Sequence, residues 1–321
     1  MPAIPKTMRA AAIERFGGPE VLALHELPVP EVDASEVLIK VHTAGVGPWD
    51  ADIRAGWWPS GRPRFPIVLG TDGSGLAASV GSRIRRLAVG DRVYSYSFNN
   101  PKGGFYAEYV AVAGEKVAHF PPVLTLERAG AIPTTGLTAL QGIDDALRLK
   151  RGESVIIHGA TGGVGSLAVQ FAKLRGARVL ATASGADGIG FARRLGADTA
   201  VDGRQGDVGE AARSFAPGGI DAVLALADGD ALTQCVEALR RGGRLAYPNG
   251  VEPAPKKRRG LEVIAYDAIP GVREFQRLGR AVEEARLKVP IAAAYKLADA
   301  AAAHERLAQG HVLGKIVLRI R

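Results

Sequence analysis

The sequence predicts an α/β protein with two domains, one compact and β-rich and one built on a doubly wound parallel sheet. Three observations predict this fold class. Residues 8–120 form short segments of β-forming residues broken by Gly and Pro. From residue 153 onward, continuous Val, Ile and Leu runs alternate with helical stretches, as in parallel strands covered on both faces. A glycine-rich turn at 159–165 separates the first of these strands from its helix.

The first domain is predicted from strands too short and too often interrupted for a layered α/β arrangement. They favour a compact antiparallel structure. The segments lie at 8–17, 36–45, 65–75, 90–97, 104–112 and 115–121.

The second domain is predicted from strands without polar alternation and from the helices between them. After these, a helix at 273–286 leads to two more strands separated by a helix, and we expect this end of the chain to rejoin the first domain. The predicted limits are 1–124 with 270–321 for the β-rich domain and 125–269 for the doubly wound one. The second-domain strands are expected at 154–159, 177–184, 199–202, 220–226, 243–248 and 261–268.

Composition narrows the class of protein. The 321 residues carry a formal charge of +8 and hold no apolar run of the length that a membrane-spanning helix needs. The first residues lack the apolar core of a secretory signal, so we expect a cytoplasmic protein with no membrane partner.

Cys235 is the one cysteine, which excludes an internal disulfide and any zinc site with two thiolates. Its apolar helical surroundings favour a buried structural residue over a nucleophile.

The densest basic run, Lys-Lys-Arg-Arg at 256–259, lies in a loop flanked by Pro and Gly. No aromatic residue is interleaved there to stack on bases, so a solvated loop is favoured over a nucleic-acid surface.

The glycine-rich turn gives the strongest chemical signal. Gly159, Gly162, Gly163, Val164 and Gly165 connect a buried strand to a helix. Glycines there let the backbone approach a pyrophosphate, and the helix start offers unpaired N–H groups to the negative charge. Strand, turn, helix and second strand occur in the expected order, so the turn predicts dinucleotide binding rather than packing alone.

The second strand bears on the choice of dinucleotide. A carboxylate at its end normally binds the ribose 2′-hydroxyl and repels a 2′-phosphate. This strand ends without Asp or Glu, and Ser184 leaves room for a phosphate. Arg193, Arg194 and Arg204 either supply countercharge or are solvated surface residues. We therefore expect NADPH.

Nearly the whole chain is similar to one family. The shared stretches are at 8–22, 45–56, 68–75, 103–112, 136–140 and 310–320. With the glycine turn, they resemble the zinc-independent quinone oxidoreductase branch of the medium-chain dehydrogenase/reductase superfamily. The resemblance implies a GroES-like catalytic domain, a Rossmann domain, a cleft between them and a homodimer.

Zinc relatives in that superfamily place a Cys where this chain has Gly47, and a His-Glu pair where it has Thr71 and Asp72. Their cysteine-rich lobe is replaced by residues 99–104. Asp72 and Asp50 alone make a poor zinc shell, so we expect no metal.

The resemblance also implies where the cofactor lies. Its pyrophosphate would lie over Gly162, Gly163 and Val164. The lysine and tyrosine that commonly hold the 2′-phosphate in this branch correspond to Gly188 and Gly203, which leaves Ser184 and Arg204 for that task. Thr138 would lie near the pyrophosphate, and Leu226, Ala227, Tyr247, Pro248 and Asn249 near the nicotinamide half.

Without zinc to polarise a carbonyl, an acceptor already activated by conjugation is the expected substrate, namely a quinone or an enone. The cofactor carries the hydride, so the protein's part is to position and enclose the reactants. Aromatic residues of two loops either stack on a planar acceptor or pack against the rest of the protein. No catalytic acid is assigned. The expected pocket residues are Gly47, Trp49, Asp50, Trp58, Tyr94 and Tyr96.

Two other functions remain open at this point. One is a non-catalytic NADPH-binding protein with a regulatory or nucleic-acid-binding role, which the basic run keeps under consideration. The other is an alcohol dehydrogenase, against which the missing zinc ligands argue.

Overall fold

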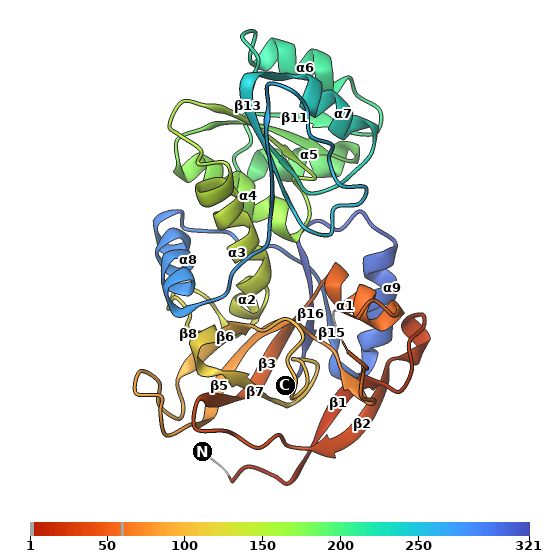
Figure 1. The fold of residues 1–321 in the computed structure, drawn as a ribbon, viewed down its shortest axis with the longest axis vertical. Helices are drawn as coiled ribbons and strands as arrows, with labels where there is room; N and C mark the ends of the chain where they lie inside the picture. The colour runs from red at the N-terminus through yellow and green to blue at the C-terminus, as the bar shows by residue number, and fades with distance from the viewer. Residues whose placement is uncertain (1–2, 59–60) are drawn as a thin grey trace. The chain divides into compact units, whose positions relative to one another are not determined.

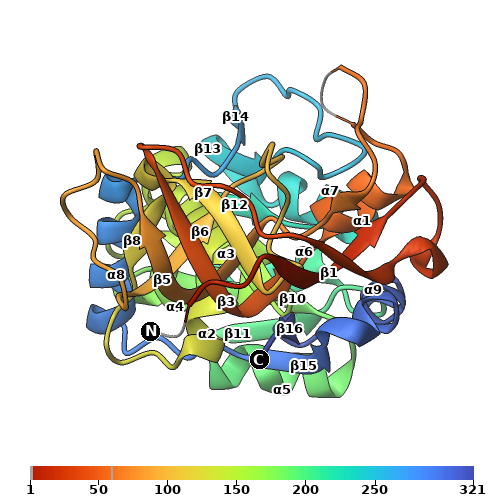
Figure 2. The same cartoon turned by 90° about the horizontal axis from the view of Figure 1, so that it is seen from below.

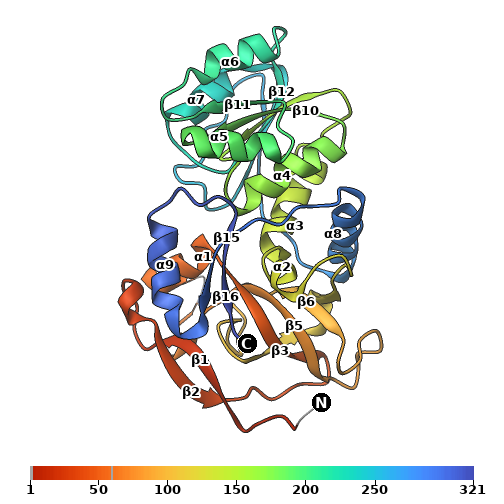
Figure 3. The same ribbon diagram turned by 180° about the vertical axis from the view of Figure 1, so that it is seen from behind.

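The computed structural model describes residues 3–58 and 61–321, which divide into two compact units (Figures 1 and 3). The first unit runs to Thr134 and adds 270–279 and 291–321, and the second contains 135–269 and 280–290. Helix α8 (Val272–Glu284) contributes residues to both. The domain limits expected from the sequence stay predictions.

The second unit is built on a sheet of six strands, which are all parallel. In space the strands follow the order third, second, first, fourth, fifth, sixth, the order of a doubly wound dinucleotide-binding sheet. The predicted parallel sheet is confirmed. The strands are β9 (Ser154–His158), β10 (Arg178–Ala183), β11 (Thr199–Asp202), β12 (Ile220–Ala225), β13 (Leu239–Pro248) and β14 (Glu262–Tyr266).

Helices connect these strands and cover the sheet. Helices α4 and α5 lie along β9, β10 and β11, while α6 packs against α7 (Figure 3). The core beneath them includes one fully buried residue from each of four strands: Ile156, Leu180, Val223 and Leu245. The helices are α3 (Pro133–Gln141), whose first two residues belong to the first unit, α4 (Gly163–Leu174), α5 (Gly185–Arg194), α6 (Val208–Phe215) and α7 (Asp230–Glu237), with a π-helical turn at Gly142–Ala146.

One helix is shorter than the sequence predicts. The apolar pattern around Cys235 predicts a helix at 230–240, but the helix ends at Glu237, and Leu239 already belongs to β13. Leu239 pairs with Ile220 of β12, and the register then shifts before Arg244 pairs with Ala222. Sheet pairing therefore overrides the helical pattern of the last residues.

The first unit contains two sheets. In the larger sheet, β3 lies between β16 and β5, and the order continues from β5 through β6 to β8 (Figure 2). The pairing of β16 with β3 is antiparallel and joins the end of the chain to this unit. Its strands are β3 (Glu36–Val46), β5 (Asp72–Val80), β6 (Arg92–Tyr96), β7 (Tyr109–Ala113), β8 (Val117–His119), β15 (Ile291–Lys296) and β16 (Lys315–Arg319); the smaller sheet holds β1 (Thr7–Ile13), β2 (Ala23–Pro28) and β4 (Ile67–Val68).

One helix of the first unit, in the stretch that follows β3, was not predicted from the sequence. There α1 (Pro48–Ala55) begins with Pro48 at its first position, where the missing N–H costs nothing. The carboxylate of Asp50 accepts a hydrogen bond from the Gly47 amide at 2.9 Å, which turns this side chain inward. Gly56, at φ 118°, ends the helix. The other helices are α2 (Leu126–Gly130) and α9 (Ala300–Ala308).

Candidate functional site

The glycine turn has the geometry of a backbone cradle. Gly159 follows β9 with φ 81°, and Gly162 is the residue that precedes α4, with no side chain capping the helix. A Cβ on Gly165 would lie 2.2 Å from the Gly159 carbonyl oxygen, so only glycine lets the helix pack this close to the turn. A Cβ on Gly162 would meet no neighbour nearer than 4.0 Å. The predicted turn thus leaves open space in front of the first amides of α4, where Gly163 and Val164 lie partly exposed.

Thr182 of β10 fixes the turn from the neighbouring strand. Its hydroxyl accepts a hydrogen bond from the Gly159 amide at 3.1 Å, and its carbonyl accepts one from Ala160 at 3.0 Å. The same hydroxyl lies 2.8 Å from Nδ1 of His158. Burial lowers the pKa of His158, so the imidazole is neutral and serves as a structural support.

Cys235 lies beneath the same strands. Its Sγ is 4.0 Å from Nδ1 of His158. The thiol is fully buried, and that burial raises its pKa to about 12. It therefore stays protonated, and the structural interpretation of this cysteine is confirmed.

The residues expected near the nicotinamide lie at the same edge of the sheet as the turn. The amide of Leu226 donates to the His158 carbonyl at 3.0 Å, and a Cβ on Gly159 would lie 3.5 Å from the Cβ of Ala227. The structure thus brings 226–227 beside the glycine turn. The Asn249 side chain, after Tyr247 and Pro248, donates to Asp267, the residue that follows β14, at 2.8 Å. Thr138, expected near the pyrophosphate, accepts with its carbonyl from the hydroxyl of Tyr266 in β14 at 2.9 Å.

The end of the second strand has a neighbour that was not considered from the sequence. Ser184 lies there without a side-chain capping bond, as expected of a residue that leaves room for a ligand. The strand itself ends without Asp or Glu, as predicted, but a carboxylate from a neighbouring strand lies beside its end. Asp202, from the end of β11, accepts a hydrogen bond from the Gly185 amide at 2.9 Å. The signal was present in the sequence, because neighbouring parallel strands end at one edge, and Ala183 pairs with Asp202.

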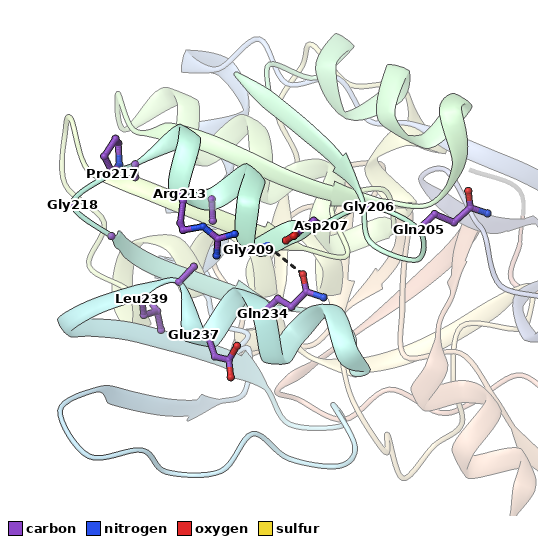
Figure 4. Close-up of a pocket in the computed structure, with 14 residues that line it drawn as sticks. Gln205, Gly206, Asp207, Gly209, Arg213, Pro217, Gly218, Gln234, Glu237 and Leu239 are labelled. Atoms are coloured by element: carbon purple, nitrogen blue, oxygen red, sulfur yellow. Dashed lines mark hydrogen bonds between the residues drawn. The ribbon is translucent and has the colours of Figure 1, made fainter.

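A cavity of about 790 Å³ lies apart from these residues, in the space between α6 and α7 (Figure 4). Gln234 accepts a hydrogen bond from the Gly209 amide at 3.1 Å across it, the dashed line in Figure 4. Of the predicted cofactor residues, none belongs to the described residues that line this cavity. It is therefore not the expected cofactor site.

The aromatic residues predicted to face a substrate separate into groups in the first unit. Trp49 lies 5.6 Å from Trp57 and 5.6 Å from Phe98, between ring centroids, so these three rings form one cluster. Trp58 instead lines a cavity of about 660 Å³ together with Thr71. Such a cavity has the size of a small-molecule site.

The two tyrosines lie deeper. Tyr94 is fully buried, its ring centroid is 4.7 Å from that of Phe275, and its hydroxyl donates to the Phe275 carbonyl at 3.0 Å. This burial leaves no ring surface for an acceptor, so we do not keep Tyr94 among the substrate residues. Tyr96, opposite Asp72 in the pairing of β5 with β6, is 9% exposed.

A buried charged cluster of Asp50, Asp72 and Lys315 occupies the place where zinc relatives carry their ligands. All three side chains are buried. Burial, and the nearby Asp72, raise the pKa of Asp50 to about 7, although the Lys315 charge opposes the rise. Asp72 accepts a hydrogen bond from the Thr134 amide at 2.8 Å.

The position of Lys315 decides whether these residues fit zinc. A Cβ on Gly47 would lie 3.3 Å from the Lys315 Nζ, so the ammonium group lies where a ligand side chain would extend. The neighbouring donors are carboxylates, with neither the thiolate nor the imidazole that zinc prefers. Among the residues that the structure describes, no group of three His, Cys, Asp or Glu side chains is arranged to hold a metal. The cluster does not fit a zinc ion.

Comparison with known proteins gives matches over most of the chain. Residues 33–122 match the family described as alcohol dehydrogenase GroES-like domain, and residues 195–318 match that described as zinc-binding dehydrogenase. A quinone oxidoreductase from Lama guanicoe is 33% identical over 98% of both chains.

Two solved structures are similar along nearly their whole length. One, described as an NAD-dependent alcohol dehydrogenase, has a TM-score of 0.90 and 33% identity, covering 98% of this chain and 100% of that one. The other is the Escherichia coli quinone oxidoreductase complexed with NADPH, with a TM-score of 0.86 and 25% identity, covering 97% of this chain and 99% of that one.

Proposed function

Since the chain belongs to the zinc-independent quinone oxidoreductase branch of the medium-chain dehydrogenase/reductase superfamily, we propose that it is an NADPH-dependent reductase of conjugated carbonyl compounds, quinones or enones. The observation that carries this proposal is the glycine turn, whose helix start has open space in front of it and no side-chain cap. The GroES-like match over residues 33–122 supports a catalytic domain in the first unit.

Within this proposal, each part of the turn has a task. The first amides of α4, at Gly163 and Val164, bind the diphosphate together with the positive end of the helix. Gly165 allows the close packing that holds them in place. Leu226 and Ala227, which lie beside the turn, contact the nicotinamide half of the cofactor. When bound, NADPH supplies the hydride that reduces the acceptor.

We further propose that the enzyme works without zinc, although part of it matches a family described as zinc-binding. The ammonium group of Lys315 beside Gly47 supports this, because a zinc ion there would face a fixed positive charge. An acceptor activated by its own conjugation needs no metal to polarise it.

The test is a screen of the purified protein for NADPH oxidation over quinones, enones, enals and enoyl thioesters, with NADH in parallel. We expect turnover with at least one quinone or enone and less than stoichiometric zinc by metal analysis. Alcohol oxidation that depends on added zinc would instead identify an alcohol dehydrogenase. Salt-dependent nucleic-acid binding, without turnover on any acceptor, would identify a non-catalytic NADPH-binding protein.

The protein's partners and location are also part of the proposal. We propose a cytoplasmic homodimer whose partner is a small-molecule substrate, and light scattering of the purified protein measures the oligomeric state. No helix in the described part of the chain is long and apolar enough to span a membrane.

A further inference from the structure

The strand that follows the dinucleotide turn ends beside a carboxylate from its neighbour. Strands β10 and β11 are parallel, and Ala183 is paired with Asp202. Oδ2 of Asp202 lies 2.9 Å from the amide nitrogen of Gly185, the first residue of α5. The carboxylate therefore lies at the end of β10, although it belongs to another strand.

The same side chain is held by two further amides. Its Oδ1 accepts hydrogen bonds from Arg204 at 2.8 Å and Gln205 at 3.3 Å. The amide bonds, first of all the one from Arg204, lower the pKa of Asp202, so the group is ionised at neutral pH. The side chain is partly exposed, so its charge faces solvent. The Gly185 amide, being occupied, is not free to bind a phosphate.

The charges near this point are of both signs, and the Arg204 charge also helps to lower the pKa of Asp202. Asp187, in the first turn of α5, lies close enough that its Oδ1 would be 3.0 Å from a Cβ on Gly185. Arg193 and Arg194 are in the last turn of this 10-residue helix, about 12 Å further along its axis. Of the three arginines considered from the sequence, Arg204 alone lies on the loop that Asp202 organises.

A carboxylate at the end of the second strand favours a free ribose 2′-hydroxyl and repels a 2′-phosphate. We propose that Asp202 is the specificity-determining residue of the cofactor site, which holds the preference for NADPH over NADH to a small value and lets the enzyme use both. This inference rests on the proposed function, since it concerns the same dinucleotide site. In this proposal the carboxylate that discriminates between the two cofactors comes from β11 and not from β10. Its negative charge opposes the attraction of Arg204 for the 2′-phosphate.

The experiment compares the wild type with Asp202→Asn and with a matched control, Asp207→Asn. Asp207 accepts from the Glu210 amide at 2.7 Å at the start of α6, so the control removes the same charge from a similar cap on the next helix. Calorimetry measures the Kd of 2′,5′-ADP and of 5′-AMP, which differ by the 2′-phosphate. Kinetics with one quinone give kcat/KM for NADPH and NADH.

We expect Asp202→Asn to raise the affinity for 2′,5′-ADP relative to 5′-AMP by about tenfold, with a parallel rise in the NADPH to NADH ratio of kcat/KM. The control should keep the wild-type ratios. Asp202→Ser, which also removes the charge, replaces the asparagine variant if thermal unfolding shows that variant to be misfolded.

Unchanged ratios in both Asp202 variants, in an enzyme that oxidises NADPH, would overturn the role of Asp202 and leave the proposed function standing. A wild type that binds neither nucleotide fragment and oxidises neither cofactor would overturn both. A wild type that already discriminates strongly against NADH would also contradict the inference.

Discussion

Asp202 and Asp50 are the same side chain in opposite surroundings. Asp202 is partly exposed and bound by backbone amides, which lower its pKa. Asp50 is fully buried beside Asp72, and burial raises its pKa to about 7. In the first case the protein presents a fixed negative charge to solvent. In the second it encloses a carboxyl group that depends on its neighbours to carry a charge at all.

The difference shows what each region is built to do. Amide donors keep the Asp202 carboxylate ionised at the proposed cofactor site. In the interior, the ammonium group of Lys315 balances two acidic groups that would otherwise be unfavourable together. Variants that change one region and not the other therefore test the comparison.

The largest expected effect is that of Lys315→Met. It leaves Asp50 and Asp72 buried without their cation, and we expect a loss of about 3 kcal/mol in the free energy of unfolding, measured with urea. Arg148→Met is the control, because Arg148 makes an exposed ion pair with Glu262. An exposed pair contributes about 0.5 kcal/mol or less. Equal losses in the two variants would show that the buried cluster contributes no more to the free energy of unfolding than an exposed ion pair.

An effect of similar size is expected from Asp50→Asn, but it depends on pH. The folded state raises the pKa of Asp50 from 3.8 to about 7, so folding holds a proton that the unfolded chain releases in this range. The wild type therefore loses stability relative to the variant as pH rises from about 4 to about 7, by roughly 3 kcal/mol. Urea unfolding at pH 4.5 and 7.5, chosen on either side of most of this range, measures the change. A constant difference across these values would contradict a raised pKa.

The smallest effect on stability is expected from Asp202→Asn, with the opposite sign. Because the folded state lowers this pKa, the carboxylate stabilises the fold above the ordinary value of 3.8, and the benefit is lost as pH falls through the lower folded value. Thermal unfolding should show a slightly less stable variant at pH 7 and a gap that closes in acid. A gap that widens in acid would mean that the group is not held ionised.

The sequence predicted the elements that repeat a strong local pattern. The run of strands from 154 onward and the turn at 159–165 were recognisable because the central strands β9, β10 and β12 are buried on both faces and Gly residues mark the turn. The helix after β3 was not expected, because its short stretch between two β segments carries little periodicity. Pro48 and Gly56 were the available signals for its ends.

The site was harder to predict from the sequence because its contacts join residues that are far apart along the chain. Lys315 reaches Gly47 only through the pairing of β16 with β3, and Asp202 reaches Gly185 only through that of β11 with β10. Tyr94 was expected to face a substrate, whereas its side of β6 turns toward the core and Phe275. These contacts depend on which distant segments pack together, and a single sequence does not show that directly.

The account depends most on the docking of the dinucleotide diphosphate at the start of α4. Calorimetric titration with NADPH of the wild type and of Gly163→Asp measures this directly. A carboxylate at the first position of a helix suits the helix dipole, so the variant should fold, while it repels the diphosphate. We predict that the wild type binds and that the variant loses at least about tenfold in affinity. Equal affinities in a folded variant would contradict the proposed site.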